Sequence, residues 1–198
     1  MSAEGKIQLI VGLGNPGPEY RDTRHNAGFW FLDELARRYS FEFRPESRFF
    51  GETARARIEG QDTRLLKPTT YMNHSGRAVS AMAGFFRIPV EAILVVHDEI
   101  DLPPGVARLK RGGGHGGHNG LRDVIAALGS REFSRLRLGV GHPGQRDEVV
   151  DYVLRKPTRE ERNQIEASID QAFDVLPDLL ANRWQRAMTT LHSTSTGK

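Results

Sequence analysis

Side chains able to activate a water molecule are spread over several short polar segments of the chain. His25 lies at the start of a predicted helix, where a histidine can act as a general base near neutral pH. Asp98 follows a hydrophobic segment, and from there its carboxylate can accept a hydrogen bond from a histidine and stabilise the imidazolium form. The alternative is that His25 only packs or caps, and that Asp98 caps a turn before Leu102. If the fold brings the two together, they predict hydrolysis by an activated water.

Three asparagines offer neutral hydrogen-bonding groups in other segments. Asn15 lies in a loop after a predicted strand, Asn73 precedes a predicted helix, and Asn119 follows a run of glycines at the mouth of another helix. An amide both donates and accepts, so these side chains can orient a substrate or a water without adding charge. For Asn73 the alternative is a simple helix cap. The sequence has no cysteine and no serine in G-x-S-x-G spacing, which argues against a covalent acyl-enzyme.

The segment from residue 12 to residue 17 has the G-x-G-x-x-G spacing of a dinucleotide-binding turn. Such a turn would make the protein a nucleotide-dependent oxidoreductase. It must open directly into a helix, whose N-terminus receives the pyrophosphate. Pro16 and Pro18 instead favour an extended loop, and helical periodicity begins only near Asn26. We therefore expect a rigid loop at the end of a strand and no nucleotide cofactor.

A second glycine-rich segment, residues 112–120, contains six glycines. This density is typical of backbone that bends sharply or lies close to something large. His115 and His118 within it, together with His97 and Asp98, raise the hypothesis of a zinc site. The spacing provides no firm third ligand, so a site without metal is the favoured hypothesis.

Positive charge is concentrated in residues 104–146. The whole chain has a net charge of +3, whereas this stretch has eight arginine or lysine residues and only two acidic ones. Guanidinium groups match the geometry of phosphate oxygens, so the stretch favours binding to a nucleic-acid backbone. The alternative is a solvated surface whose acidic partners lie elsewhere in the fold. The candidates for phosphate contact are Arg108, Lys110, Arg135 and Arg137.

Hydrophobic periodicity predicts the elements that must position these groups. Strands are predicted at residues 7–13, 49–58, 63–67, 92–97, 106–110 and 136–140, the second and third as a hairpin. Helices are predicted at residues 26–39, 76–87 and 119–128, and from Thr158 onward, where Thr158 and Glu161 fit a capping box and Pro177 ends or kinks the helix. Strands mixed with helices predict an α/β fold with a central twisted mixed β-sheet flanked by α-helices.

Length and composition fit a single globular domain. The chain has 198 residues, of which 38% are hydrophobic and 27% charged, and no linker or repeat divides it. We therefore predict one domain over residues 1–198, with residues 1–6 and 193–198 frayed. No apolar run approaches the ~18 residues of a membrane span, and the N-terminus lacks the apolar region of a secretory signal. The expected location is the cytoplasm.

Taken in order, the polar segments resemble those of bacterial-type peptidyl-tRNA hydrolase. The matching segments are residues 11–17, 23–28, 68–73, 97–99 and 112–120, followed by 135–144. The resemblance covers nearly the whole chain. It implies a single catalytic domain with a peptidyl-tRNA hydrolase-like, phosphorylase/hydrolase-like fold. It also implies a metal-independent and cofactor-independent monomer without an obligate protein partner, which cleaves the ester between a peptide and tRNA so that the tRNA is recycled.

The resemblance also implies roles for individual residues. His25 would take a proton from water, and Asp98 would hold and polarise the histidine. Asn15 would help to separate N-blocked peptidyl-tRNA from ordinary aminoacyl-tRNA. Asn73 and Asn119 would bind the end of the substrate and position the water. The residues that would line the cleft around them are Tyr20, Tyr71 and Met72.

Two departures from the family pattern concern binding rather than chemistry. Arg108 and Tyr71 stand where relatives often carry lysine and phenylalanine. Three other functions remain open: an RNA-binding protein without catalysis, a nucleotide-dependent oxidoreductase and a metal-dependent hydrolase. RNA binding without catalysis would explain the basic stretch but would give His25 and Asp98 no function.

Overall fold

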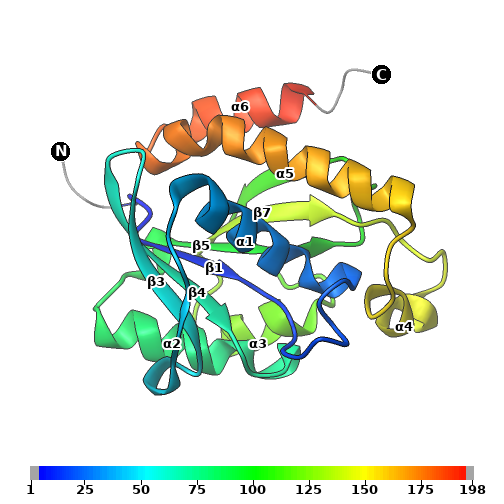
Figure 1. Cartoon of the computed structure of the whole chain (residues 1–198), viewed down its shortest axis with the longest axis horizontal. Helices are drawn as coiled ribbons and strands as arrows, with labels where there is room; N and C mark the ends of the chain where they lie inside the picture. The colour runs from blue at the N-terminus through cyan, green and yellow to red at the C-terminus, as the bar shows by residue number, and fades with distance from the viewer. Residues whose placement is uncertain (1–4, 195–198) are drawn as a thin grey trace.

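The computed structural model describes residues 5–194, which form a seven-stranded mixed β-sheet between two layers of helices (Figure 1). The strand order is β2-β3-β4-β1-β5-β7-β6; β4, β1, β5 and β7 run parallel, whereas β2, β3 and β6 are antiparallel to their neighbours. The strands are β1 (Leu9–Gly12), β2 (Arg44–Glu46), β3 (Gly51–Ile58), β4 (Gln61–Pro68), β5 (Ile93–Glu99), β6 (Ala107–Arg111) and β7 (Ser134–Gly139). The predicted α/β fold with a mixed sheet is confirmed.

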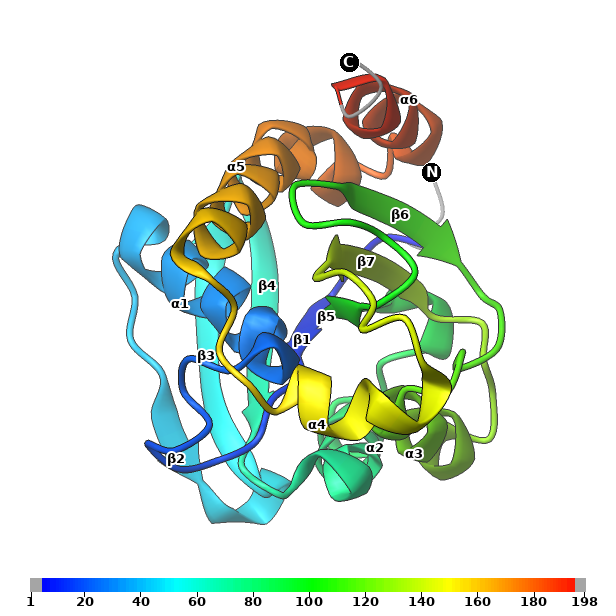
Figure 2. The ribbon, with the colours of Figure 1, turned by 90° about the vertical axis from the view of Figure 1, so that its right-hand side faces the viewer.

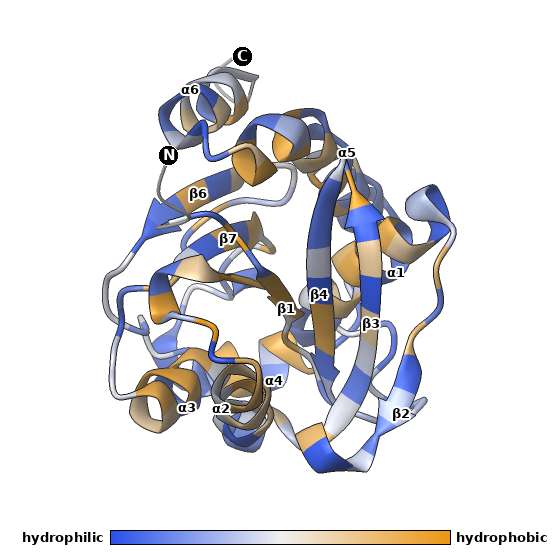
Figure 3. Cartoon of the chain, turned by 90° about the vertical axis from the view of Figure 1, so that its left-hand side faces the viewer, coloured by the Kyte–Doolittle hydropathy of each residue, from blue (hydrophilic) through white to orange (hydrophobic). Residues whose placement is uncertain are grey.

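The central strands are buried on both faces because helices cover each side of the sheet (Figures 1 and 2). Ile10 and Val96 pack into a core with α1 (Ala27–Tyr39), α5 (Arg159–Leu180) and α6 (Trp184–Thr194). Val11 and Val95 face the opposite core, formed with α2 (Ser75–Phe85) and α3 (Asn119–Leu128). Parallel strands covered on both faces are hydrophobic without alternation. Figure 3 shows the contrast between β1, which is hydrophobic along its length, and β3, in which hydrophilic residues alternate.

Most predicted elements are present with shifted ends. The helix predicted at residues 119–128 has those bounds, and β5 extends to Glu99, two residues beyond its predicted end. Pro177 does not end its helix, since α5 continues to Leu180 and buries Leu176 and Leu180 on either side of the proline. Three elements of the structure were not predicted: β2, α6 and the short helix α4 (Val149–Val153).

The ends of the described part reach into the segments expected to fray. Ser193 and Thr194 belong to the last turn of α6, and Gly5 and Lys6 precede β1. Residues 1–4 and 195–198, the rest of those segments, lie outside the described residues. Within residues 5–194, every helix is too short or too polar to cross a membrane.

Close backbone contact brings the first helix directly onto the ends of β1 and β5. A Cβ atom on Gly28 would lie 2.5 Å from the carbonyl oxygen of Val96, and one on Gly12 would lie 2.5 Å from the carbonyl oxygen of Gly28. Real Cβ atoms do not approach so closely, so both positions require glycine. The 3₁₀ turn Arg24–Asn26, which leads into α1, is thereby held over the end of β5.

Candidate active site

A cleft of about 970 Å³ opens where β1 and β5 end. In an α/β fold, ligands bind outside the carboxyl ends of the parallel strands, and the cleft lies at that edge. Eight of the predicted site residues line it: Asn15, Tyr20, His25, Tyr71, Met72, Asn73, Asp98 and Asn119. The sheet therefore brings together segments that are far apart in the sequence.

His25 and Asp98 form a buried pair on the cleft wall. His25 Nδ1 donates to Asp98 Oδ2 over 2.8 Å, and the two residues are 8% and 2% exposed. An ionised carboxylate only accepts hydrogen bonds, so the proton of the neutral imidazole lies on Nδ1. Nε2 is then unprotonated and can take a proton from water, which is the arrangement that a general base requires.

The second oxygen of Asp98 is bound by His118, which the sequence analysis considered only as a zinc ligand. His118 Nε2 donates to Asp98 Oδ1 over 2.8 Å, while its Nδ1 accepts the N–H of Leu121 at 3.2 Å and so caps α3. Burial alone would raise the pKa of Asp98, but His25 and His118 together hold it well below its usual range. The carboxylate is therefore ionised at every pH at which a histidine titrates.

His97 is fully buried behind this pair and is not a candidate base. Burial, aided by the nearby His118, lowers the pKa of His97 to about 3, so the ring stays neutral. Its Nδ1 donates to the carbonyl oxygen of Asp98 over 2.8 Å. His97 thus helps to fix the backbone that carries Asp98.

Asn15 is fixed so that its NH₂ group is the part left for a ligand. Its Oδ1 accepts the N–H of Met72 at 2.6 Å, and an oxygen must occupy that position because the amide nitrogen has no lone pair to offer. Asn26 holds the backbone of Asn15 with two further hydrogen bonds, of 2.9 and 3.0 Å. Asn26 was not predicted as a site residue. It ties the Asn15 loop to the turn that carries His25.

The remaining cleft residues form its rim. Tyr71 is 58% exposed and packs edge-to-face with Tyr20, with ring centroids 6.4 Å apart. Asn119 begins α3, and its Oδ1 accepts from Arg122 at 3.1 Å. Asn73 does not cap α2, whose capping position is taken by His74 without a side-chain bond. The capping alternative for Asn73 is therefore wrong, and its amide lies at the cleft.

One predicted phosphate contact is corrected by the structure. Arg135 is only 2% exposed, and its guanidinium donates to the carbonyl oxygens of Gly113 and Gly114 and, at 3.3 Å, of Arg131. Its place in β7 puts it on the same face as Arg137, but the glycine-rich loop covers it. Arg135 therefore anchors the loop that leads into α3 and is not available to a phosphate.

The other three basic candidates form what we call the basic strip: Arg108, Lys110 and Arg137, on one face of the β6–β7 pair. Arg108 on β6 lies directly opposite Arg137 on β7, and Lys110 is exposed. Arg137 Nη1 lies 3.7 Å from Oε1 of Glu99, which itself lines the cleft. The basic strip thus adjoins the site without lining it.

The dinucleotide interpretation does not fit the loop that follows β1. A Cβ atom on Gly14 would lie 2.7 Å from the ring of Phe29, so this glycine is packed against α1. The chain then passes through turns and enters its first helical turn only at Arg24. A pyrophosphate would find no helix N-terminus directly after these glycines.

The hydrogen bonds also oppose the zinc interpretation. His115 does not line the cleft, and its Nδ1 accepts from the backbone of Gly117. Within residues 5–194, the group of side chains close enough to hold a metal is His25, Asp98 and His118. His118 Nδ1 already accepts a hydrogen bond, so Nε2 carries the proton of the neutral ring, and a metal there would have to displace it and break the cap of α3.

An apolar wall completes the cleft, and no sequence signal predicted it. Val149, Val150, Val153 and Leu154, in and just after α4, line the side facing the polar residues. Figure 2 shows α4 beside the start of α1 and near α3. The cleft therefore combines polar lining residues with one hydrophobic wall.

Comparison with known proteins gives consistent results along the whole chain. The sequence profile of the peptidyl-tRNA hydrolase family matches residues 9–198. The peptidyl-tRNA hydrolase of Halorhodospira halophila is 62% identical over 190 residues, covering 96% of this chain and 98% of the relative. That of Neisseria meningitidis serogroup B is 56% identical over 187 residues, with 94% and 97% covered. The crystal structure of peptidyl-tRNA hydrolase from Acinetobacter baumannii superposes with a TM-score of 0.93 at 47% identity, covering 97% of each chain.

Proposed function

The chain belongs to the peptidyl-tRNA hydrolase family, and from that premise we propose that it hydrolyses the ester between a peptide and the 3′ end of tRNA by histidine general-base catalysis. The observation that carries the mechanism is the His25–Asp98 hydrogen bond on the wall of a cleft lined by three asparagines. An ester needs a base, an oriented water and donors for the developing oxyanion.

In the proposed reaction, the water oxygen attacks the ester carbonyl carbon while His25 Nε2 takes a proton from that water. The tetrahedral intermediate then collapses, the bond to the tRNA 3′ oxygen breaks, and His25 returns the proton to the departing oxygen. Asp98 stabilises the imidazolium between the two steps because its carboxylate stays ionised. Amide N–H groups of Asn73 and Asn119 are the candidates for orienting the water and holding the oxyanion.

The fixed orientation of Asn15 supports selection for N-blocked substrates. Because Oδ1 is occupied by the N–H of Met72, the side chain offers donors to the cleft. A donor pairs with the carbonyl oxygen of an acylated α-nitrogen and opposes a free α-ammonium, which is itself a donor. We therefore assign Asn15 to the discrimination between peptidyl-tRNA and aminoacyl-tRNA.

The most direct test of the proposed function is to incubate the protein with N-acetylated aminoacyl-tRNA and with the unblocked aminoacyl-tRNA, and to measure the release of free tRNA. Release from the blocked substrate alone is expected. If the protein binds both RNAs but cleaves the ester of neither, the alternative of a non-catalytic RNA-binding protein would be supported. Binding of NAD(P) would instead support the oxidoreductase.

The basic strip is proposed to bind tRNA phosphates. Lys110→Ala should weaken tRNA binding. It should also make the slope of log K against log [salt] less steep by ~0.7–0.9 for each phosphate that the variant no longer binds. The affinity should be measured from low to moderate salt. Arg57→Ala, which removes an exposed arginine from β3 near the other edge of the sheet, serves as the matched control. An unchanged slope for Lys110→Ala would place the tRNA contact elsewhere.

We propose that the reaction needs no metal, since His118 commits both ring nitrogens to hydrogen bonds. Activity after extensive dialysis against a chelator should equal that of untreated protein. A loss that is restored by Zn²⁺ would contradict this and support the metallohydrolase alternative.

We further propose that the protein acts as a monomer in the cytoplasm, where its tRNA substrate occurs, without an obligate protein partner. The support for the monomer is that the eight cleft residues all come from one chain.

A further inference from the structure

The apolar wall of the cleft belongs to an element with little packing of its own. Helix α4 has five residues, of which Val153 alone is buried, and Val150 is 58% exposed. A helix this short cannot maintain itself in water, because its few hydrogen bonds do not offset the cost of forming the first turn. Something outside α4 must fix its position against the cleft.

Arg24 provides that anchor from the turn that carries His25. Its side chain is buried, and Nη1 donates to the carbonyl oxygens of Tyr152 at 2.9 Å and Arg155 at 3.4 Å. Its backbone N–H donates to the same carbonyl of Arg155 at 3.1 Å. The guanidinium also lies over the Tyr152 ring, 3.9 Å from the centroid. Arg24 thus binds the end of α4 in three ways: through its backbone N–H, through hydrogen bonds from its guanidinium, and through the contact of its guanidinium with the Tyr152 ring.

Both sides of this contact are held in turn. Arg24 Nη2 lies 3.3 Å from Oε1 of Glu161, which also closes the capping box of α5 with Thr158. The hydroxyl of Tyr152 donates to the carbonyl oxygen of Val140 at 2.7 Å. Arg24 is therefore held at its base by Glu161, and α4 is held by Arg24 on one side and by the hydrogen bond from Tyr152 to Val140 on the other.

We propose that Arg24 is a positioning residue that docks the α4 wall on the catalytic turn and so sets the width of the substrate cleft. This rests on the proposed function of the cleft. The base itself is held by other contacts, since Asp98 binds His25 and Asn26 ties the same turn to Asn15. Arg24 thus governs substrate binding more than the chemical step.

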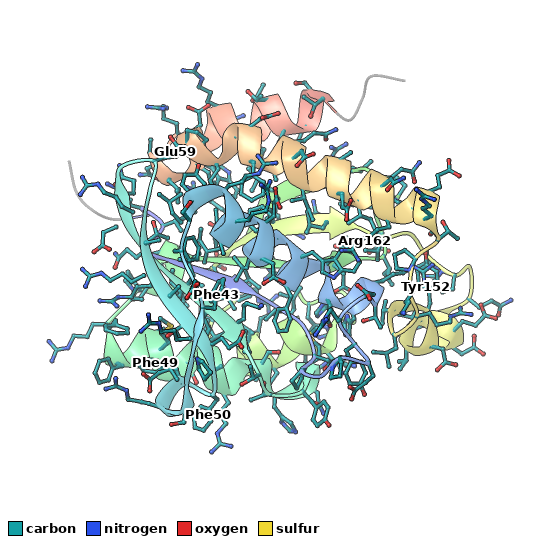
Figure 4. All side chains as sticks on the ribbon, in the orientation of Figure 1. Phe43, Phe49, Phe50, Glu59, Tyr152 and Arg162 are labelled. Atoms are coloured by element: carbon teal, nitrogen blue, oxygen red, sulfur yellow. The ribbon has the colours of Figure 1, made fainter. Side chains whose placement is uncertain are left out.

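Two other roles for Arg24 make different predictions. If its positive charge tuned His25 directly, a lysine in its place would serve equally well, and removal of the charge would shift the pH profile. If Arg24 only stabilised the fold, another partly buried arginine with similar contacts would matter as much. Arg162 is that match: it stacks on Trp30 at 3.5 Å, pairs with Glu166 at 2.9 Å and lies 3.7 Å from Asp22, and none of these three residues belongs to α4. Figure 4 labels Arg162 and, in α4, Tyr152.

The experiment compares Arg24→Lys with Arg162→Lys in steady-state hydrolysis of N-acetylated aminoacyl-tRNA. An ammonium cannot bond two carbonyls and a carboxylate while stacking on a ring. We expect Arg24→Lys to raise KM by about 10-fold, the size of one charge-assisted hydrogen bond. We expect kcat to stay within about 3-fold, as for loss of uniform binding, with an unchanged pH profile of kcat. Arg162→Lys should leave KM unchanged.

Hydrogen exchange gives a readout that does not depend on activity. In Arg24→Lys the amides of residues 149–155 should exchange faster, while the strands keep their protection. An unchanged KM in Arg24→Lys, an equal rise of KM in Arg162→Lys, or unchanged exchange in residues 149–155 would each overturn the proposal. Failure of the unmodified protein to cleave the substrate would refute the proposed function alone, because the exchange experiment would still test the docking of α4.

Discussion

Replacing His25 with alanine is expected to lower kcat on N-acetylated aminoacyl-tRNA by about 10² or more, the usual contribution of a general base. The expectation follows from the Nδ1 contact with Asp98, which leaves Nε2 of His25 as the proton acceptor at the cleft. Initial rates should be measured at saturating substrate, so that kcat is separated from binding. Binding of tRNA should survive, because the basic strip is unchanged.

The matched control is His115→Ala, which removes a histidine that does not line the cleft. It should retain the kcat of the unmodified protein. It also tests the zinc interpretation, in which His115 was a ligand. A near-normal kcat for His25→Ala would end the proposed mechanism.

The second large effect is expected for Asp98→Asn, which should lower kcat by about 10² to 10⁴. The carboxylate accepts from His25 with one oxygen and from His118 with the other. Asparagine has one acceptor and one donor in the same space, so one of the two histidines would face a donor. If that is His25, its Nδ1 must accept and its proton lies on Nε2, which can then no longer act as the base. If it is His118, the N-terminus of α3, and with it Asn119, loses its support.

His118→Ala separates these two contributions, because it leaves the contact between Asp98 and His25 in place. A smaller loss of kcat than in Asp98→Asn is expected, and thermal unfolding should show whether each variant is folded. Equal kcat for Asp98→Asn and the unmodified protein would contradict a role for the carboxylate in holding the base.

Much of the fold was predictable because the central strands are strongly patterned. Residues 92–96 form an uninterrupted hydrophobic run, and the burial of this segment on both faces leaves little freedom for another assignment. The cleft residues follow from the same logic, since polar groups that come directly after parallel strands meet at one edge of the sheet. The sequence does not contain the distances, however, and neither residue type nor spacing predicts the 2.8 Å contact between His25 and Asp98.

The features that were not predicted depend on contacts that the alternation and periodicity of hydrophobic residues do not reveal. Arg135 has the strand position of a surface arginine, but a loop folds over it and buries its guanidinium. Helix α4 is too short to show a periodic pattern, and Arg24, far away in sequence, fixes it. His118 looked like a metal ligand because its backbone partner, Leu121, is a contact that residue types do not reveal.

The most direct test of the mechanism is the pH dependence of kcat for the unmodified protein and for His25→Ala with N-acetylated aminoacyl-tRNA. In the unmodified protein, kcat should rise with pH as one group loses its proton and then level off, because the base must be unprotonated. The residual activity of His25→Ala should lack that ionisation. The same ionisation in both proteins would assign the base to another group and contradict the account.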